Sequence, residues 1–373
     1  MKIAYMIASA YNSGGMERVL LNKTSYLVKA GYDVTIITTD QKGRTTFFPF
    51  APEIKMIDLS INYSDTNGKS IFVKFFDHIC KQRKHQTKLT EVLKREKYDV
   101  VVSMFGNEMS FFTNIKDGSK KIAEIHFSKF FRKQLNRGGL WSISDKIREK
   151  RDEKLMQKLD NFVVLTHEDK TFWPDTNNLS VIHNHAPFEE GKIASLNVKR
   201  AVAIGRLEYQ KGFDKLISIW QIVATKHPDW KLDIYGSGPD YDQLIEQINT
   251  VGIAQQVAIH PPTPTIEDEI MQSSIYLLTS NYEGLPMVML ETMACGVPTV
   301  AFACKCGPRD VIQDKVNGCL IPEGNIQEFA EAVSTLIQDE SLRKTMGIAA
   351  KKTIKNKFTE DVIMQQWTNM FYS

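Results

Sequence analysis

The sequence predicts an α/β protein made of two doubly wound, Rossmann-like domains that face each other across a cleft. First, strand-length runs of Val, Ile and Leu recur along the chain, separated by amphipathic segments of helix length. Because these runs are nearly continuous rather than alternating, they predict strands buried on both faces, which is typical of parallel sheets covered by helices. Second, the same pattern occurs in each half of the chain. Third, 373 residues are too many for one ordinary core, so two domains are expected.

Apolar runs in both halves are the expected strands. In the first half they are KIAYMIASA (2–10), DVTIITT (33–39), DVVVSMF (99–105), KIAEIHF (121–127) and NFVVLT (161–166). In the second half they are AVAIG (201–205), KLDIYG (231–236), QVAIH (256–260), IYLLTS (275–280), PTVAFA (298–303) and GCLIP (318–322). Between the two sets, residues 184–200 lose hydrophobic periodicity and are rich in Pro, Gly and charges. We therefore expect domains at 1–190 and 191–358, with a final amphipathic helix at 359–373 that packs back on the first domain.

The composition is that of a soluble globular protein, with 42% hydrophobic and 24% charged residues. No apolar run approaches the roughly 18 residues of a membrane span, and the first run is expected to be a buried strand rather than a secretion signal. The five cysteines show no CxxC spacing, so we expect reduced thiols in a cytoplasmic protein rather than a disulfide scaffold or a zinc site. We expect no metal and no cofactor.

The two halves differ in charge. Residues 1–196 carry 31 Lys+Arg and 23 Asp+Glu, a net charge of +8, whereas the remainder carries 16 and 21, a net charge of −5. In the first half Phe130, Phe131 and Trp141 stand among cations. Such a stretch is ordinarily a solvated helix face, but clustered aromatic and basic side chains also suit an anionic membrane surface. We therefore expect a peripheral contact with the inner membrane leaflet. No nucleic-acid-binding motif accompanies the charge, so we expect no nucleic acid partner.

Glycines and cations follow several of the expected strands. Gly14 and Gly15 precede a helix expected near residue 16, and the free N–H groups of such a helix start attract anions. Arg206 and Lys211 lie between a buried strand and a helix expected from Phe213, where a guanidinium fork and an ammonium suit a diphosphate. The loop after the next strand contains Gly236 and Gly238. Each feature alone can also be a plain turn or a pair of solvated cations; together they predict a phosphate-rich, nucleotide-sized ligand in the second domain.

The block NYEGLPMVMLETMACGVP contains two glutamates, Glu283 and Glu291, eight positions apart. A metal pair would favour His or Asp-x-Asp beside the block, and neither adjoins it. Acid/base work at one sugar carbon needs carboxylates about 5–9 Å apart. Glu291, expected about two turns into a helix that starts near Pro286, should be farther away than that. The remaining interpretation, which we favour, is that the two carboxylates hold hydroxyls at opposite ends of one elongated ligand.

These motifs resemble those of the retaining nucleotide-sugar glycosyltransferases of the GT-B fold, which build capsules, lipopolysaccharides and glycan precursors. GGMERV, GRLEYQKGFDKLI, YGSGP, the two-glutamate block and CGPRDVI occur in that family's order and spacing. The resemblance covers nearly the whole chain and is strongest from Gly205 to Pro322. Two stretches depart from the family pattern. VIHNHAP has His183 where the family has proline, and HPPTPTIEDEI, which should border the base, lacks the usual glycine-containing form.

The resemblance implies that the domain at 1–190 binds the acceptor and that the domain at 191–358 binds the nucleotide-sugar. It also implies roles for individual residues. Glu283 would hold hydroxyls of the donor sugar and Glu291 those of the ribose. Arg206 and Lys211 would hold the diphosphate, and His126 would lie beside the reacting face of the sugar. The implied catalytic residues are His126, Glu283, Arg206 and Lys211. The implied donor-binding residues are Gly14, Gly15, Gly205, Arg206, Lys211, Gly236, Glu283, Gly284, Leu285, Pro286, Met287, Val288 and Glu291.

The expected function is that of a metal-independent hexosyl- or N-acetylhexosaminyltransferase. It would move a sugar from a nucleotide-sugar, of which UDP-sugars are the commonest in the resembling group, to a glycan or lipid-linked acceptor during cell-surface polysaccharide synthesis. No general base is evident, and the family's proposed mechanism lets the donor phosphate take the acceptor proton. Two alternatives stay open: a nucleotide-sugar epimerase of the same twin-domain plan, and a non-catalytic nucleotide-sugar-binding module.

Overall fold

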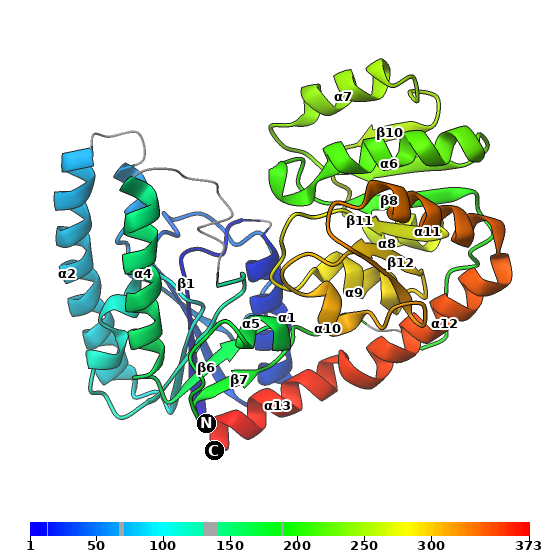
Figure 1. Cartoon of the computed structure of the whole chain (residues 1–373). Coiled ribbons are helices and arrows are strands. Elements are labelled where there is room, and N and C mark those ends of the chain that lie inside the picture. Colours follow the sequence, from blue (N-terminus) through cyan, green and yellow to red (C-terminus); the bar gives the residue numbers. More distant parts are fainter. Residues whose placement is uncertain (13, 67–70, 130–139, 188–189) are drawn as a thin grey trace. The chain divides into compact units, whose positions relative to one another are not determined.

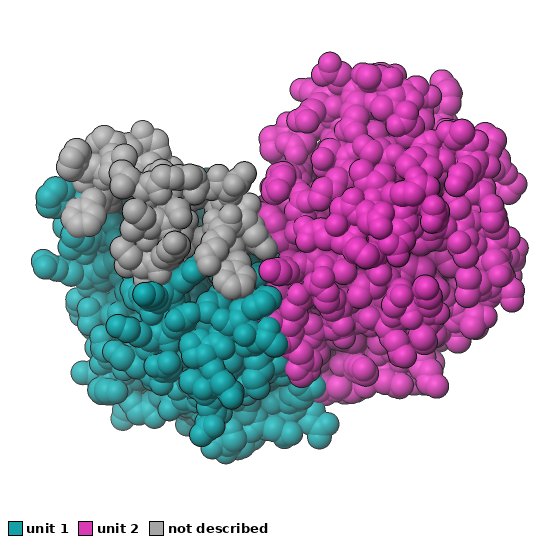
Figure 2. Space-filling model, viewed as in Figure 1, with its two compact units in different colours: residues 1–164, 170–182, 364–373 teal, residues 165–169, 183–363 magenta. Residues whose placement is uncertain are grey.

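The computed structural model describes residues 1–12, 14–66, 71–129, 140–187 and 190–373. The chain divides into two compact units (Figure 2). Unit 1 contains Met1–Val164, Lys170–Ile182 and Met364–Ser373, and unit 2 contains Leu165–Asp169 and His183–Ile363. Among the residues described, no helix is both long and apolar enough to cross a membrane.

Unit 1 is built on a seven-stranded sheet in the order β3-β2-β1-β4-β5-β6-β7, in which every pairing is parallel. Its strands are β1 (Lys2–Ile7), β2 (Asp33–Thr38), β3 (Lys55–Asp58), β4 (Val100–Ser103), β5 (Lys120–Glu124), β6 (Asn161–Val164) and β7 (Leu179–Val181). Its helices are α1 (Gly15–Lys29), α2 (Ile71–Glu96) and α4 (Leu140–Met156), with short 3-10 turns η1 (Tyr63–Thr66), η2 (Asn107–Ser110) and η3 (Phe112–Asn114). Figure 1 shows these helices flanking the sheet.

Unit 2 contains a six-stranded parallel sheet in the order β10-β9-β8-β11-β12-β13. Its strands are β8 (Arg200–Ile204), β9 (Lys231–Tyr235), β10 (Val257–His260), β11 (Ile275–Leu278), β12 (Thr299–Phe302) and β13 (Gly318–Ile321). The helical elements are α5 (His167–Lys170), η4 (Tyr209–Lys211), α6 (Phe213–Lys226), α7 (Tyr241–Thr250), α8 (Ile266–Met271), α9 (Met287–Ala294), α10 (Pro308–Val311), α11 (Ile326–Gln338) and α12 (Glu340–Lys357). Each face of the sheet has its own buried cluster.

The predicted fold class is confirmed, and each apolar run expected to be a strand contains one. Two strands were missed, β3 and β7, and they are the two edges of the unit 1 sheet. An edge strand is partly open to solvent, so it carries a weaker apolar run than a central strand. In β3 the first two residues, Lys55 and Met56, are exposed, and β7 has only three residues.

The last helix, α13 (Glu360–Tyr372), carries the chain from unit 2 back to unit 1. Its Trp367 is fully buried, and the ammonium of Lys23 lies 4.0 Å from the centre of the Trp367 ring. Lys120 Nζ donates to the Met370 carbonyl at 2.6 Å, at the far end of the same helix. The C-terminal segment is therefore part of the unit 1 core.

Candidate functional site

In unit 2 two loops far apart in sequence form one structure. The first, residues 205–212, follows β8, and the second, residues 279–286, follows β11, the neighbour of β8 in the sheet. Asn281 N donates to the Gln210 carbonyl at 2.8 Å, and Gln210 Nε2 donates to the Tyr282 carbonyl at 3.2 Å. Because the carboxyl ends of neighbouring parallel strands lie at one edge, the sheet brings both motifs to the place where ligands of such sheets bind.

Close backbone contacts explain the glycines of this region. Gly212 has φ of 61°, and a Cβ there would lie 2.3 Å from the Thr279 carbonyl oxygen. A Cβ on Gly236 would lie 2.0 Å from the Gly205 carbonyl oxygen. Residues with a side chain cannot occupy these positions without moving the backbone. The glycines thus hold the loops after β8, β9 and β11 together.

Lys211 and Glu283 join the two motif loops. Lys211 Nζ lies 2.7 Å from Glu283 Oε1, with side-chain exposures of 17% and 7%. Ser280 Oγ donates to the same Oε1 atom at 2.6 Å. In the described part of the chain no group bonds to Oε2, so this oxygen can accept a hydroxyl of a ligand. The cation expected at the diphosphate and the carboxylate expected at the sugar therefore form one pair.

Arg206 is placed differently. Its side chain is 71% exposed, and Nη2 lies 2.7 Å from Glu208 Oε1 and 3.3 Å from Gln210 Oε1. An exposed ion pair of this kind contributes only about 0–1 kcal/mol to stability. The guanidinium can therefore leave Glu208 for a stronger anion at little cost.

Helix α9 presents an uncapped N-terminus after the second loop. Pro286 is its N-cap residue and no side chain caps it, while the N–H groups of Met289 and Leu290 donate to the Pro286 carbonyl at 3.1 and 3.3 Å. Among the described residues, no group accepts from the N–H groups of Met287 and Val288, so these two are left for a ligand. Glu291 is the fifth residue of α9, little more than one turn from its start, so the expectation of two turns was wrong.

Both glutamates act electrostatically on one buried phenol. Burial raises the pKa of Tyr276, on β11, well above its usual value, and the charges of Glu283 and then Glu291 raise it further. The two carboxylates thus lie near the same strand. Glu291 itself is half-buried on α9.

The predicted glycines of unit 1 lie at the start of α1. Gly14 is the N-cap residue and Gly15 the first helical residue. A Cβ on Gly14 would lie 2.3 Å from Glu17 Oε2, whereas a Cβ on Gly15 would meet no atom within 4 Å. A carboxylate of the protein therefore already lies at this helix start, and open space remains beside Gly15.

His126 follows β5 and lies over a buried charge pair. Its side chain is 4% exposed, and Nε2 lies 3.3 Å from Glu124 Oε2. The same carboxylate oxygen accepts from Lys23 Nζ, and both partners are fully buried. Burial alone would raise the pKa of Glu124, but Lys23 and His126 outweigh it and lower this pKa to about 2. Sequence reasoning missed Lys23 and Glu124, although a glutamate within an apolar strand was a signal, since a buried charge needs a partner.

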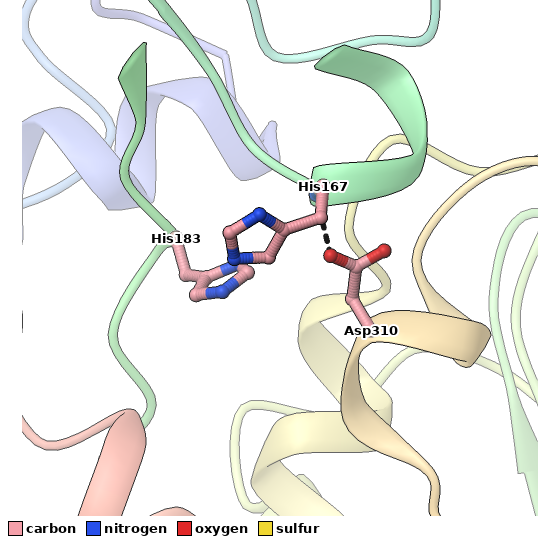
Figure 3. A group of neighbouring side chains, drawn as sticks. All are labelled: His167, His183 and Asp310. Carbon is pink, nitrogen blue, oxygen red and sulfur yellow. Dashed lines mark hydrogen bonds between the residues drawn. The ribbon is translucent and has the colours of Figure 1, made fainter. Parts of the chain in front are cut away.

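His183, which stands where the family has proline, belongs to a group of three side chains that can hold a metal ion (Figure 3). His167, His183 and Asp310 each offer one ligand atom, and these atoms lie within 4.8 Å of one another. His183 Nδ1 is 2.6 Å from the Leu165 carbonyl, so Nε2 is the nitrogen left for a ligand. Asp310 also accepts from the N–H groups of His167 and Glu168, which ties α10 to the start of α5. The sequence predicted no metal site, and the cysteines Cys304 and Cys306 are buried free thiols.

The structure does not describe the side chains of the residues expected at a membrane surface. Phe130 and Phe131 lie outside the described residues, and Trp141 falls in α4 at a position where only the backbone is described.

Comparisons with known proteins agree with this architecture. A family model described as "Glycosyltransferase Family 4" matches residues 13–194, and one described as "Glycosyl transferases group 1" matches residues 189–353. An uncharacterized glycosyltransferase of Haemophilus influenzae is 31% identical over 98% of this chain and 98% of its own length. The amylovoran biosynthesis glycosyltransferase AmsD of Erwinia amylovora is 26% identical over 99% of each chain.

Solved structures show the same fold. The crystal structure of TarM, a protein of S. aureus, superposes with a TM-score of 0.81 at 19% identity, over 100% of this chain and 99% of TarM. HepE of Anabaena in complex with UDP superposes with a TM-score of 0.77 at 17% identity, over 100% of each chain.

Proposed function

Because this chain belongs to the GT-B glycosyltransferases, we propose that it is a metal-independent retaining enzyme that transfers a hexose or N-acetylhexosamine from UDP to a glycan or lipid-linked acceptor. The setting we propose is the synthesis of a cell-surface polysaccharide. The observation that carries the proposal is the Lys211–Glu283 pair, which places a cation and a hydroxyl acceptor together beside the uncapped start of α9.

The relatives support both the donor and the setting. One relative, which matches over nearly its full length, is named for amylovoran biosynthesis. Other relatives, which match part of this chain, are named for lipopolysaccharide galactosyl transfer and for glycosylation of poly(ribitol-phosphate) and poly(glycerol-phosphate). The TarM and HepE structures include complexes with UDP. A sugar transferred from UDP to a growing surface polymer fits all of these names.

In the proposed reaction, the bond from the sugar C1 to the donor phosphate breaks and a bond from C1 to the acceptor oxygen forms on the same face. The proton of the acceptor hydroxyl goes to the departing phosphate oxygen. Lys211, Arg206 and the first N–H groups of α9 stabilise the charge that grows on the diphosphate, which is the kind of preorganised electrostatic effect that contributes most in enzymes. Glu283 Oε2 holds a donor-sugar hydroxyl, and His126 keeps the role that the family resemblance gives it.

Metal independence rests on the chemistry around the proposed diphosphate site. Each carboxylate at that place, Glu283 and Glu208, is already paired with a cation, Lys211 and Arg206 respectively. These two cations can neutralise the diphosphate, which is the task that a divalent ion held by carboxylate and water ligands would otherwise perform. The cluster of His167, His183 and Asp310 offers the softer imidazole set of a transition metal. Activity in EDTA should therefore equal that of the untreated enzyme; loss of turnover that Mg²⁺ or Mn²⁺ restores would contradict the proposal.

A panel of UDP- and GDP-sugars tests the function directly. We expect release of UDP from one donor, faster in the presence of acceptor, with the α-anomeric configuration of the donor kept in the product. Conversion of the donor sugar to its epimer without transfer would identify an epimerase, and binding without any turnover would identify a non-catalytic module.

The membrane contact is a separate proposal that rests on the basic charge of residues 1–196. Vesicles containing anionic lipid should sediment the protein at 0.1 M salt and release it at 1 M, because the Debye length falls from about 10 to about 3 Å. Sedimentation that is absent, or that salt and replacement of Trp141 do not change, would contradict it.

A further inference from the structure

Unit 1 contains a cavity that the reaction scheme above does not use. It has a volume of about 400 Å³ and lies where β4 and β5 end, between α2 and α4, which Figure 1 shows beside each other. Its lining residues are His78, Gln82, Phe105, Gly106, Asn107, Met109, Ser110, Phe127, Arg148, Arg151 and Asp152. The carboxyl end of a parallel sheet is the usual place for a ligand, and this volume is that of a small-molecule site.

One wall of the cavity is aromatic. The rings of Phe105 and Phe127 meet edge to face with centroids 6.1 Å apart, and Phe105 also packs on Phe162 of the sheet at 5.8 Å. Phe105 has φ of 61°, a conformation that few residues with side chains adopt. Phe105 and Phe127 thus give the cavity an aromatic wall at the ends of β4 and β5, which suits the apolar CH face of a sugar ring.

A second wall is polar. Ser110 Oγ donates to Gln82 Oε1 at 2.7 Å, and Gln82 Nε2 donates to the Asn107 carbonyl at 3.0 Å. These bonds connect α2 to the turn after β4 and fix the orientation of the amide. Hydroxyl and amide groups placed in this way can bond to sugar hydroxyls.

The third wall is cationic. Arg148 and Arg151 are three positions apart on α4, so they share a face of that helix. Within the described residues no carboxylate pairs with Arg148, and Arg151 Nη2 is 3.8 Å from Asp152, the one acidic residue in the lining. Burial lowers the pKa of His78, and the charges of Arg151 and Arg148 lower it further, so both arginines act electrostatically on the cavity. Two arginines against one aspartate give the lining a net positive charge.

The family resemblance already implies an acceptor in the first domain. We propose that it binds in this cavity and that it carries a phosphate group, held by Arg148 and Arg151, with its sugar ring against Phe105 and Phe127. Two guanidinium groups match the charge of a phosphate and can bond to it in a bidentate manner. Phe127 of the lining directly follows His126, the residue assigned to the reacting sugar, in the chain. The inference rests on the proposed transfer reaction and deepens it by naming the chemical class of the acceptor.

Calorimetric titration with α-glucose 1-phosphate and, as the neutral match, methyl α-glucoside tests this without turnover. We expect the phosphate to bind the wild-type protein at least about tenfold more tightly than the neutral glucoside. The double variant Arg148→Gln/Arg151→Gln should lose this preference. Arg83→Gln, an exposed arginine on α2 outside the lining, should keep it. Arg206→Gln/Lys211→Gln should keep it too, because it removes only the proposed diphosphate site.

Three results would overturn the inference: equal affinities in the wild type, a preference that survives in Arg148→Gln/Arg151→Gln, or a preference lost only in Arg206→Gln/Lys211→Gln. If the first double variant instead lost only binding to vesicles of anionic lipid, the arginines would serve the membrane and not the acceptor. Arg151 is 57% exposed and Arg148 is also exposed, so these substitutions should leave the melting temperature unchanged. Failure of the proposed function would appear separately, as no nucleotide released from any donor.

Discussion

Each unit contains a lysine–glutamate pair beside a predicted site residue, and the two pairs differ in burial. In unit 2, Lys211 and Glu283 keep side-chain exposures of 17% and 7%, and the carboxylate has one oxygen without a protein partner in the described region. In unit 1, Lys23 and Glu124 have exposures of 1% and 0%. The first pair can exchange its contacts for those of a ligand, whereas the second is fully buried and cannot contact a ligand.

The difference separates binding from positioning. Glu124 cannot reach a ligand, but its Oε2 lies 3.3 Å from His126 Nε2, so the buried pair sets the environment of that imidazole. The Lys23 ammonium is held in turn by Glu124 and by the ring of Trp367 from the last helix. Unit 1 therefore contributes a rigid support for one histidine, and unit 2 contributes the groups that touch the donor in our proposal.

The largest effect should come from breaking the sealed pair. Lys23→Met leaves the Glu124 carboxylate buried without its cation, and removing one member of a buried pair costs about 3–5 kcal/mol of unfolding free energy. Urea denaturation measures this, with Lys29→Met, an exposed lysine of the same helix, as the matched control. The double variant Lys23→Met/Glu124→Leu should recover part of the loss. Equal stability of Lys23→Met and wild type would show that the pair carries no structural role.

The open pair should respond in turnover rather than in stability. Lys211→Met and Arg206→Ala each remove a charged hydrogen bond from the departing diphosphate, worth about 1.5–3 kcal/mol. We expect kcat/KM to fall roughly 10- to 150-fold, mainly through kcat, because the charge grows as the sugar leaves. Steady-state kinetics at saturating acceptor measures this.

Stability distinguishes these two residues. Arg206 is exposed, and among the described residues it pairs only with Glu208 and Gln210 of its own loop, so Arg206→Ala should leave the melting temperature unchanged. Lys211→Met should lower the melting temperature slightly through the loss of the Glu283 contact. Near-normal rates in both variants, with the fold intact, would refute the diphosphate assignment.

The two pairs also show which residues a sequence motif can single out and which it cannot. Gly205, Lys211 and Glu283 stand in compact motifs because loops after adjacent strands must carry fixed residues at fixed spacing. Central strands were predicted because burial on both faces leaves a continuous apolar run. Phe105, Arg148 and Lys23 lie on three elements distant in sequence, and only the sheet order brings such residues into one unit. No local pattern encodes that, so the unit 1 cavity could not be predicted. Of the buried charge pair only Glu124 left a local signal, because it is a glutamate within an apolar strand, and its partner Lys23 left none.

The group of His167, His183 and Asp310 could not be predicted from the sequence for the same reason. His183 was recognised as a departure from the family pattern, but its partners were not, because His167 follows β6 and Asp310 follows β12. The fold brings these three residues together from distant parts of the sequence. The spacing of residues along the chain does not predict such a contact.

The smallest predicted effect concerns the division of labour within unit 2. Glu291→Gln exchanges a charged acceptor for a neutral one, a loss of about 1 kcal/mol or about fivefold in binding. The ribose is remote from the reacting carbon in our proposal, so binding of the ground state and of the transition state should weaken alike, and only the donor KM should rise.

Glu283→Gln acts on a sugar that becomes positively charged as its bond to phosphate breaks, and it also weakens the contact with Lys211, so kcat should fall instead, by at least about tenfold. Measuring kcat, KM and melting temperature for both variants decides between the alternatives. If the two carboxylates only brace α9, the melting temperature will fall while the kinetics stay the same, and identical kinetic profiles would mean that both glutamates hold the same part of the donor.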